Sequence, residues 1–203
     1  MKNETKIQLL PFEIELMCND SLILTKNAIM QKLKDFLEEI QKKQLVIIEE
    51  NIAALPGEVL KTSPKVSKGE NYKGLPWLVL DFPRHFEHEN IFAIRTMFWW
   101  GNFFSISIHL SGRYKKQLES KIINNKSQLE KNQFLFCINQ NEWEHHFEQD
   151  NYKSAGDFTK KKFQEIISKQ AFLKLGKKIP LDNINEIEPL LCNNYEKLVK
   201  IIC

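Results

Sequence analysis

The sequence predicts an α+β protein, in which a mostly antiparallel sheet of about five strands packs against long N-terminal and C-terminal helices. Aromatic and β-branched residues are concentrated in three short runs, at 77–82, 91–100 and 103–110, as is typical of strands. Apolar residues recur at helical spacing over residues 20–55 and 189–202. We expect these two helices to cover the same face of the sheet or to pack as a pair. A chain of 203 residues would be cramped as two domains, so we expect one.

The chain begins with a short apolar run at residues 7–17 that is broken by a proline, and this pattern predicts a strand or an edge segment. The Asn-Asp-Ser sequence at 19–21 follows, and these residue types cap helices. The helical pattern behind them continues until the Pro-Gly pair at 56–57 stops it. The run Leu-Val-Ile-Ile at 45–48 is also compatible with a strand. We favour one long helix with a kink near Lys43.

The next segment, residues 56–76, contains three prolines, three glycines and no apolar periodicity, which predicts a long, flexible loop. Loops of this length within a compact domain are often lids or binding loops, or are simply mobile.

A hairpin is predicted behind this loop, because Gly101 and Asn102 separate the second and third strand-like runs. A two-residue turn at this point would place Arg95 opposite Ile108, on an apolar face. A slip of one residue would exchange the two faces of one strand relative to the other.

The C-terminal half is predicted to add two helices and a second hairpin. A basic helix is expected from about 114 to 130, and the segments 134–138 and 143–147 are expected to form the hairpin. Ser-x-x-Asp at 154–157 resembles a capping box, which would open a helix that closes near Gly176.

Composition excludes several classes of protein. The formal net charge of +3 is too small to indicate a nucleic-acid ligand, and the basic stretches 113–131 and 153–178 are better explained as solvated helix faces. No apolar run approaches the length of a membrane span, and no signal peptide is evident. The four cysteines are widely spaced, which fits neither a disulfide framework nor a zinc ribbon. We therefore expect a cytoplasmic protein.

The arginines indicate where function lies. Of 29 cationic residues only three are arginine, and all three, Arg84, Arg95 and Arg113, fall within residues 77–113. Where lysine is the default cation, an arginine suggests a need for its planar, bidentate guanidinium group. An arginine on an apolar face needs an acceptor, which could be an anionic ligand or, more commonly, a structural partner such as Asp81.

The first hypothesis is a binding module for a small anionic or aromatic ligand, or for a peptide end, in a pocket between the sheet and the 56–76 segment. Arginines would meet the anion, aromatic rings would stack, and histidines would donate hydrogen bonds. The residues expected in these roles are Arg84 and Arg95, Trp99, Trp100 and Phe103, and His85 and His109.

Two patterns suggest catalysis, but both are weak. His85, His88 and Glu89 could hold a divalent metal on the connection between two strands, although a polar, solvated loop explains them more simply. The Ser-x-Ser-x-His sequence at 105–109 places its three side chains on one strand face, but no nucleophile elbow occurs. A metal-assisted enzyme is therefore the second hypothesis, and whether any reaction is catalysed stays open.

The third hypothesis is an interaction subunit. The aromatic hairpin and the basic helices would then dock a protein partner.

Overall fold

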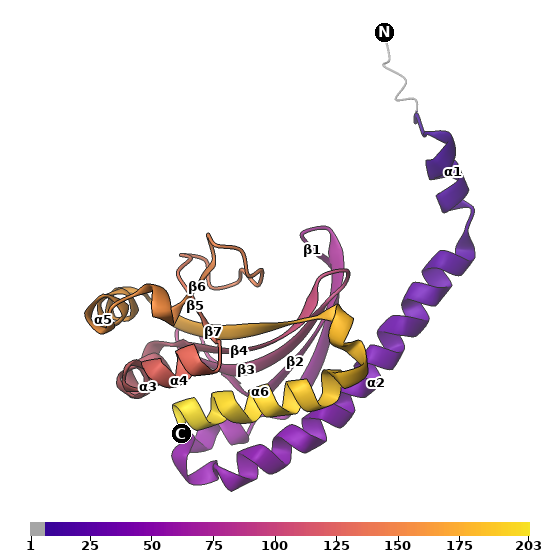
Figure 1. The fold of residues 1–203 in the computed structure, drawn as a ribbon. Helices are drawn as coiled ribbons and strands as arrows, with labels where there is room; N and C mark the ends of the chain where they lie inside the picture. Colours follow the sequence, from indigo (N-terminus) through magenta and orange to yellow (C-terminus); the bar gives the residue numbers. More distant parts are fainter. Residues whose placement is uncertain (1–6) are drawn as a thin grey trace.

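The structure is a computed structural model that describes residues 7–203, and these residues form six α-helices and a seven-stranded sheet (Figure 1). The helices are α1 (Pro11–Met17), α2 (Asp20–Glu50), α3 (Gly112–Asn124), α4 (Lys126–Lys131), α5 (Lys160–Lys169) and α6 (Ile187–Ile202). The strands are β1 (Lys65–Tyr72), β2 (Leu75–Phe86), β3 (Ile91–Trp99), β4 (Phe103–Ser111), β5 (Leu135–Cys137), β6 (Tyr152–Ser154) and β7 (Phe172–Pro180). The predicted α+β class is confirmed.

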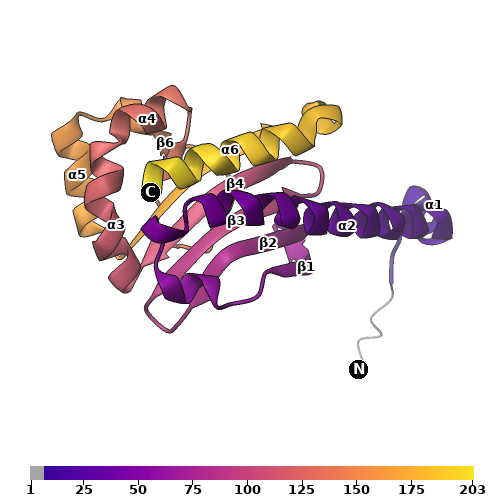
Figure 2. The same ribbon diagram turned by 90° about the horizontal axis from the view of Figure 1, so that it is seen from below.

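The sheet has the strand order β1-β2-β3-β4-β7-β5-β6, and every neighbouring pair is antiparallel. One face, which we call the helix face, is covered by α2 and α6, which lie side by side across it as predicted (Figure 2). The opposite face, which we call the loop face, is covered by the irregular segment 138–151, which lies above the sheet in Figure 1. The sheet is therefore enclosed by helices on one side and by a loop on the other.

The predicted register of the β3–β4 hairpin is wrong by one residue. Trp99 pairs with Phe103, so the turn has three residues, with Gly101 at a positive φ of 70°. As a result, Arg95 lies opposite Ser107 and not opposite Ile108. The shift places Arg95, Ser107 and His109 on the loop face, together with apolar residues such as Met97. Apart from Thr96, the helix face of both strands carries apolar residues.

Of the two predictions for the N-terminal region, the strand is wrong and the long helix is confirmed. Residues 11–17 form helix α1 and not a strand, because Pro11 occupies the first helical turn, where its missing N–H costs nothing. The Glu13 carboxylate also accepts a hydrogen bond from the Leu10 N–H at 2.7 Å, which closes this end of the helix. The long helix predicted behind it is α2, with Asn19 as its cap, and residues 45–48 continue it.

The segment predicted as a loop, residues 56–76, contains strand β1. This strand lies at the edge of the sheet, and it exposes charged residues such as Lys65 and Lys68, which give it no apolar period to recognise. At Gly69 the chain passes directly under Trp77, where an added Cβ would come within 2.4 Å of the ring. Gly69 is thus a strand residue that makes room for an aromatic neighbour.

The C-terminal half departs from prediction in two places. Residues 172–180 form β7, which lies between β4 and β5, whereas the sequence pattern predicted a helix up to Gly176. Residues 143–147 are irregular, and β5 pairs with β6 in place of the predicted strand. The capping box at 154–157 is present, but it opens a single 3₁₀ turn, and Thr159 caps α5 separately.

The predicted basic helix is confirmed, with a break at Asn125 that divides it into α3 and α4. The last helix, α6, starts two residues before the predicted Pro189. Within residues 7–203, none of the helices combines the length and the apolar character that crossing a membrane requires.

Candidate functional site

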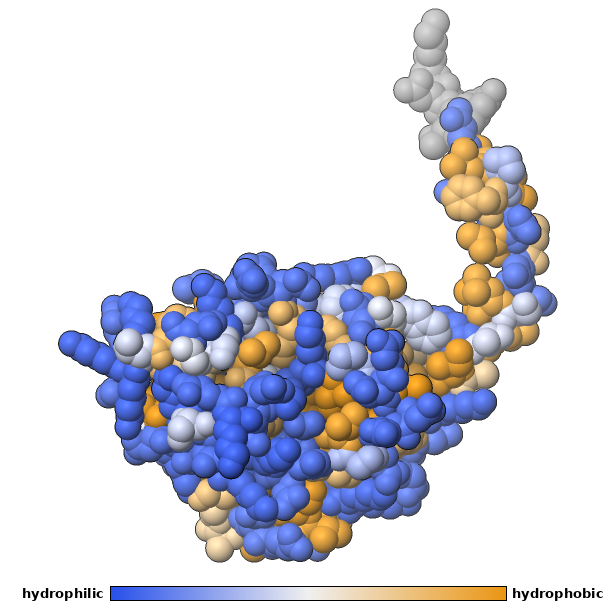
Figure 3. Space-filling model, in the orientation of Figure 1, coloured by the Kyte–Doolittle hydropathy of each residue, from blue (hydrophilic) through white to orange (hydrophobic). Residues whose placement is uncertain are grey.

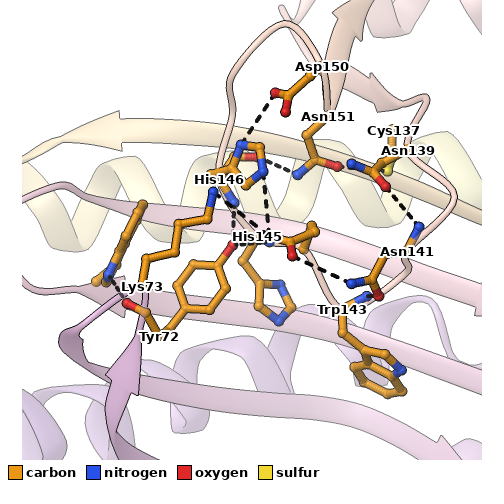
Figure 4. Close-up of polar contacts among 12 residues, drawn as sticks. Tyr72, Lys73, Cys137, Asn139, Asn141, Trp143, His145, His146, Asp150 and Asn151 are labelled. Carbon is orange, nitrogen blue, oxygen red and sulfur yellow. Dashed lines mark hydrogen bonds and ion pairs between the residues drawn. The ribbon is translucent and has the colours of Figure 1, made fainter.

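The loop over the sheet, residues 138–151, is fixed near its middle by Tyr72 (Figure 4). The Tyr72 hydroxyl accepts hydrogen bonds from the backbone N–H groups of His145 at 2.7 Å and His146 at 3.1 Å. It donates to the Glu144 carboxylate at 3.0 Å. Burial, together with the negative charge of Glu144, raises the pKa of Tyr72 to about 12. Tyr72 therefore stays protonated and holds the loop to the end of β1.

A buried lysine fixes the same loop from below. Lys174 of β7 is only 2% exposed, and its ammonium group donates to the backbone carbonyls of Glu142 at 3.0 Å and Glu144 at 2.5 Å. Burial lowers the pKa of Lys174 to about 8. The loop thus supplies carbonyl oxygens to a cation that the sheet has taken out of water.

Arg95 and Asp81 are cross-strand neighbours at the centre of the loop face. Two parallel hydrogen bonds join them, from Arg95 Nε to Asp81 Oδ1 at 2.8 Å and from Arg95 Nη2 to Asp81 Oδ2 at 2.9 Å. Both side chains are mostly buried, with 13% and 12% exposed. The structural partner considered from the sequence is confirmed, and the charge of Arg95 is compensated within the protein.

His145 lies between Arg95 and Lys174. Its Nε2 is 3.2 Å from Arg95 Nη1, and its Nδ1 is 3.3 Å from Lys174 Nζ. Burial, and then the two nearby cations, lower the pKa of His145 well below its usual value, so the ring is neutral. A neutral imidazole has one N–H and one acceptor nitrogen, and Arg95 can act only as a donor.

This geometry is fully satisfied in one protonation state. If Lys174 is a neutral amine, its two hydrogens serve the carbonyls of Glu142 and Glu144, and its lone pair accepts the Nδ1–H of His145. His145 Nε2 then accepts from Arg95. If Lys174 is charged, it can only donate, as Arg95 does. The ring nitrogen of His145 that carries the hydrogen, whichever it is, then faces a second donor. Deprotonation of Lys174 therefore completes the hydrogen-bond network beneath the loop.

A cavity of about 410 Å³ opens beside this network, between the β1–β2 hairpin and the covering loop. Its base holds the Asp81–Arg95 pair, and its walls combine aromatic rings with small polar groups. The lining residues are Ser67, Asn71, Tyr72, Trp77, Val79, Asp81, Arg95, Met97, Trp143 and His145. This volume suits a small organic molecule.

The aromatic residues expected to stack on a ligand are separated by the corrected register. Trp99 and Phe103 lie on the loop face, with ring centroids 5.4 Å apart, but both are buried and neither lines the cavity. Trp100 packs on the other side, where its ring centroid is 6.2 Å from that of Phe98 in the core. Trp77 and Trp143 line the cavity in their place.

Arg84 and His85 lie outside the cavity. Arg84 donates from Nε to the carbonyl of Ser63 at 2.9 Å. The His85 ring packs 5.7 Å from Tyr114, and its Nε2 is 3.1 Å from a Glu87 carboxylate oxygen.

The residues considered as metal ligands are not gathered into a site. His88 and Glu89 lie in the exposed turn between β2 and β3. Across residues 7–203, no three side chains of His, Cys, Asp or Glu are arranged to hold a metal ion. The structure therefore offers the metal-assisted hypothesis no site in this region.

His109 shares the loop face but lies away from the cavity. Its Nε2 is 2.8 Å from the Glu142 carboxylate, and its ring contacts Trp143 and Phe172 at centroid distances of 5.5 and 5.8 Å. Burial lowers the pKa of His109, and the hydrogen bond to Glu142 partly opposes this shift. His109 supports the loop next to Trp143, and it is not placed to contact a ligand in the cavity.

Two residues central to the site, Tyr72 and Lys174, were not predicted. Tyr72 fell in a segment that lacked strand periodicity. Lys174 did leave a signal, because a strand would place this lysine of the apolar run Phe-Leu-Lys-Leu on the face opposite to that of the two leucines beside it. A lysine in that position needs a partner on the same face.

No family model, curated protein or solved structure matches this chain.

Proposed function

We propose that this protein is a binding module, and that its cavity takes a small planar ligand with an aromatic ring and a polar edge. The observation that carries the proposal is that aromatic walls and a fixed polar group share one cavity. Tyr72, Trp77 and Trp143 supply the walls, and the Asp81–Arg95 pair supplies the polar group. Pockets for small ligands generally combine apolar walls with a few placed polar groups.

The charge of the cavity base narrows the ligand class. Asp81 already binds Nε and Nη2 of Arg95, so the pair as a whole is neutral and offers little attraction to a free anion. It still offers carboxylate lone pairs as acceptors and the remaining Nη1–H of Arg95 as a donor. An amide or a nitrogen heterocycle matches this combination better than a carboxylate does. The anionic ligand expected from the sequence is thus replaced by a polar, uncharged one.

The polar groups are held in place before any ligand arrives. Asp81 and Arg95 fix each other through two hydrogen bonds, and His145 holds the third nitrogen of the guanidinium group. A ligand therefore does not have to order these side chains, which lowers the entropic cost of binding.

A matched set of three fragments tests the ligand class: benzamide, benzoate and benzylamine share one ring and differ in the charge of the polar group. We expect benzamide to bind with a Kd on the order of millimolar, as is usual for a molecule of about nine non-hydrogen atoms. Benzoate and benzylamine should bind at least about fivefold more weakly, because each lacks one half of the donor–acceptor match. The measurement is a titration followed by ¹⁵N NMR.

The four tryptophan indole N–H signals locate the binding site in the same experiment. Those of Trp77 and Trp143 should shift with benzamide, whereas that of Trp100, on the helix face, should not. Trp77→Leu should weaken binding, and Trp100→Leu is the matched control. Equal affinity for all three fragments, or shifts confined to Trp100, would contradict the proposal.

A further inference from the structure

The N-terminal arm, which we define as residues 7–25, is the most apolar part of the surface (Figure 3). Of the seventeen large hydrophobic residues that are exposed in the described chain, ten lie within these nineteen positions. The arm consists of α1 and the first turns of α2, and it projects away from the sheet (Figure 1). Exposed apolar surface on this scale indicates a docking surface.

The apolar stripe of α2 continues beyond the region that the sheet covers. Ile23, Met30 and Leu37 follow one another at seven-residue spacing, so they share one side of the helix. Leu37 and Met30 are buried against the sheet, with 0% and 8% exposed, whereas Ile23 is 55% exposed. The helix therefore carries a packing face that its own chain leaves open at the N-terminal end.

Helix α1 also requires a packing partner. It has seven residues, none of them buried, and isolated helices shorter than about 12–15 residues are marginal in water. Its stability must come mostly from packing of its apolar side chains. We infer that α1 gains this packing from another molecule.

The charge of the arm limits what that molecule is. The arm carries three acidic residues, Glu13, Glu15 and Asp20, and no cation. Helices that lie on membrane surfaces usually carry lysine and arginine on their polar side, and anionic lipids would repel this arm. Residues 26–203, in contrast, carry 27 lysines and arginines against 22 acidic residues. The arm is thus complementary in charge to the remainder of its own chain.

A groove at the base of the arm fits this description. It lies between α2 and β1 and has a volume of about 570 Å³, and its apolar lining consists of the buried side chains of Met30 and Leu78 and the partly buried Val66. Lys34 and Lys68 line it, together with Glu70, which pairs with Lys26. Lys34 is bound to Glu38 at 3.0 Å, and Lys68 makes no ion pair within residues 7–203. A cationic rim around an apolar base suits an acidic, apolar helix.

We propose that two copies of this chain form a symmetric dimer in which each arm docks into the α2–β1 groove of the other copy. The groove adjoins the base of the arm. A two-fold axis near that point therefore places the arm of each copy in the groove of the other copy. Covering a large aliphatic side chain removes roughly 100 Å² of apolar surface from water. About half of the ten apolar residues of each arm can face one groove, so the two arms together lose roughly 1,000 Å². The groove surfaces that they cover add a similar area, and the total matches a stable, specific interface of roughly 1,200–2,000 Å².

The first test is the mass of the full chain in solution, measured by sedimentation equilibrium over a range of concentrations. We expect twice the mass of the chain. The double variant Ile14→Asp/Ile23→Asp should weaken association at least about a hundredfold, because it places charges in the apolar interface. The control is Ile52→Asp/Ile184→Asp, which changes two residues of similar exposure outside the arm and should stay dimeric. All four positions are exposed, so thermal unfolding should show that each variant still folds.

The second test is a charge exchange. Glu15→Lys/Asp20→Lys in the arm and Lys34→Glu/Lys68→Glu in the groove should each weaken the dimer at least about tenfold at low salt. A chain that carries all four changes should regain most of the affinity, because the attraction is restored with its sign reversed. A general loss of stability would not produce this rescue.

A photo-crosslinker attached to the exposed Cys18 identifies what the arm contacts. In a mixture of ¹⁴N- and ¹⁵N-labelled protein, we expect crosslinks between the two labels that map to α2 and β1. Crosslinks within one label would show that the arm folds back on its own chain, and a monomer at all concentrations would show a free arm. Either result overturns the proposal, as does binding of the arm to anionic lipid vesicles in preference to a second copy.

Discussion

The two faces of the sheet are built by the same strands but differ in what they present and in what covers them. Along β3 and β4, the helix face carries residues such as Ile94 and Ile108, which are fully buried beneath α2 and α6. The loop face carries Arg95, Ser107 and His109, beneath a segment held by hydrogen bonds. Because successive side chains point to opposite faces of the sheet, the same strands build the core on one face and the candidate site on the other.

The energetics of the two coverings differ as well. Burial of a large apolar side chain contributes about 1.5–3 kcal/mol, and the helix face has many such residues. A hydrogen bond contributes about 0.5–1.5 kcal/mol net, and the loop is held by a few bonds from Tyr72 and Lys174 and by one buried aromatic ring, that of Phe147. The loop should therefore open locally more often than the sheet unfolds, and such opening would give the proposed ligand access to the cavity.

The largest effect expected on the loop face comes from breaking its ion pair. Arg95→Met should lower the free energy of unfolding by about 2–4 kcal/mol, because Asp81 then stays buried without its partner. The double variant Asp81→Leu/Arg95→Met should recover most of this loss, since no charge remains to be buried. Urea denaturation of the variants measures both effects.

Arg84→Met is the matched control for this experiment. Arg84 makes one hydrogen bond to the Ser63 carbonyl, so its replacement should cost less than about 1 kcal/mol. If the double variant at Asp81 and Arg95 is less stable than Arg95→Met alone, the pair contributes stability of its own. The site would then resemble the helix face, in which the contacts themselves stabilise the fold.

The second effect depends on pH. Because the pKa of Lys174 is lowered to about 8 in the folded protein, the unfolded chain binds more protons between about pH 8 and pH 10.5. Stability contributed at this position therefore rises as the pH rises through that range. We expect the difference in unfolding free energy between the natural chain and Lys174→Met to grow by about 1–2 kcal/mol from pH 7.5 to 9.5. Buried thiols and histidines titrate in both proteins, so their effects cancel in the difference.

Hydrogen exchange measures the same lysine at the loop. Lys174→Met should accelerate exchange of the His145 and His146 amides, because the carbonyls that hold the loop lose their donor. Lys177→Met is the control, since Lys177 lies on the same strand but bonds to Asn132 on the other side of the sheet. Equal acceleration in both variants, together with a pH-independent difference, would show that Lys174 does not hold the loop.

These two faces also explain how far the sequence could predict the structure. The long helix α2 and the strands β2 to β4 follow from local periodicity, and the structure confirms them. The register between β3 and β4 does not follow, because β3 has apolar residues at both alternations, such as Met97 on one face and Phe98 on the other. A turn one residue longer than expected then decides which face receives Arg95.

The covering loop could not be predicted from local pattern either. Residues 143–147 alternate as a strand would, but Lys174 binds the carbonyls of Glu142 and Glu144, and it lies about 30 residues further along the chain. The Asp81–Arg95 pair was predictable because both residues fall on adjacent predicted strands and an arginine there needs an acceptor. Contacts between neighbouring strands are thus within reach of sequence analysis, whereas contacts that hold a loop across a sheet are not.

The third effect on stability concerns a polar pair on the helix face. Gln44 of α2 donates from Nε2 to the Thr96 hydroxyl at 2.8 Å, and both residues are fully buried. The Gln44 Oε1 atom has no hydrogen-bond partner within residues 7–203. Thr96→Val should therefore cost about 1–2 kcal/mol, because the whole Gln44 amide then lacks partners.

The double variant Gln44→Met/Thr96→Val should be within about 1 kcal/mol of the natural chain, or more stable, because an apolar pair suits this face. Urea denaturation of the single and the double variant measures this outcome. If the double variant loses more than the single one, the Gln44–Thr96 bond fixes how α2 lies on the sheet. The helix face would then depend on a specific polar contact, as the loop face does, and the division of roles between the two faces would fail at this point.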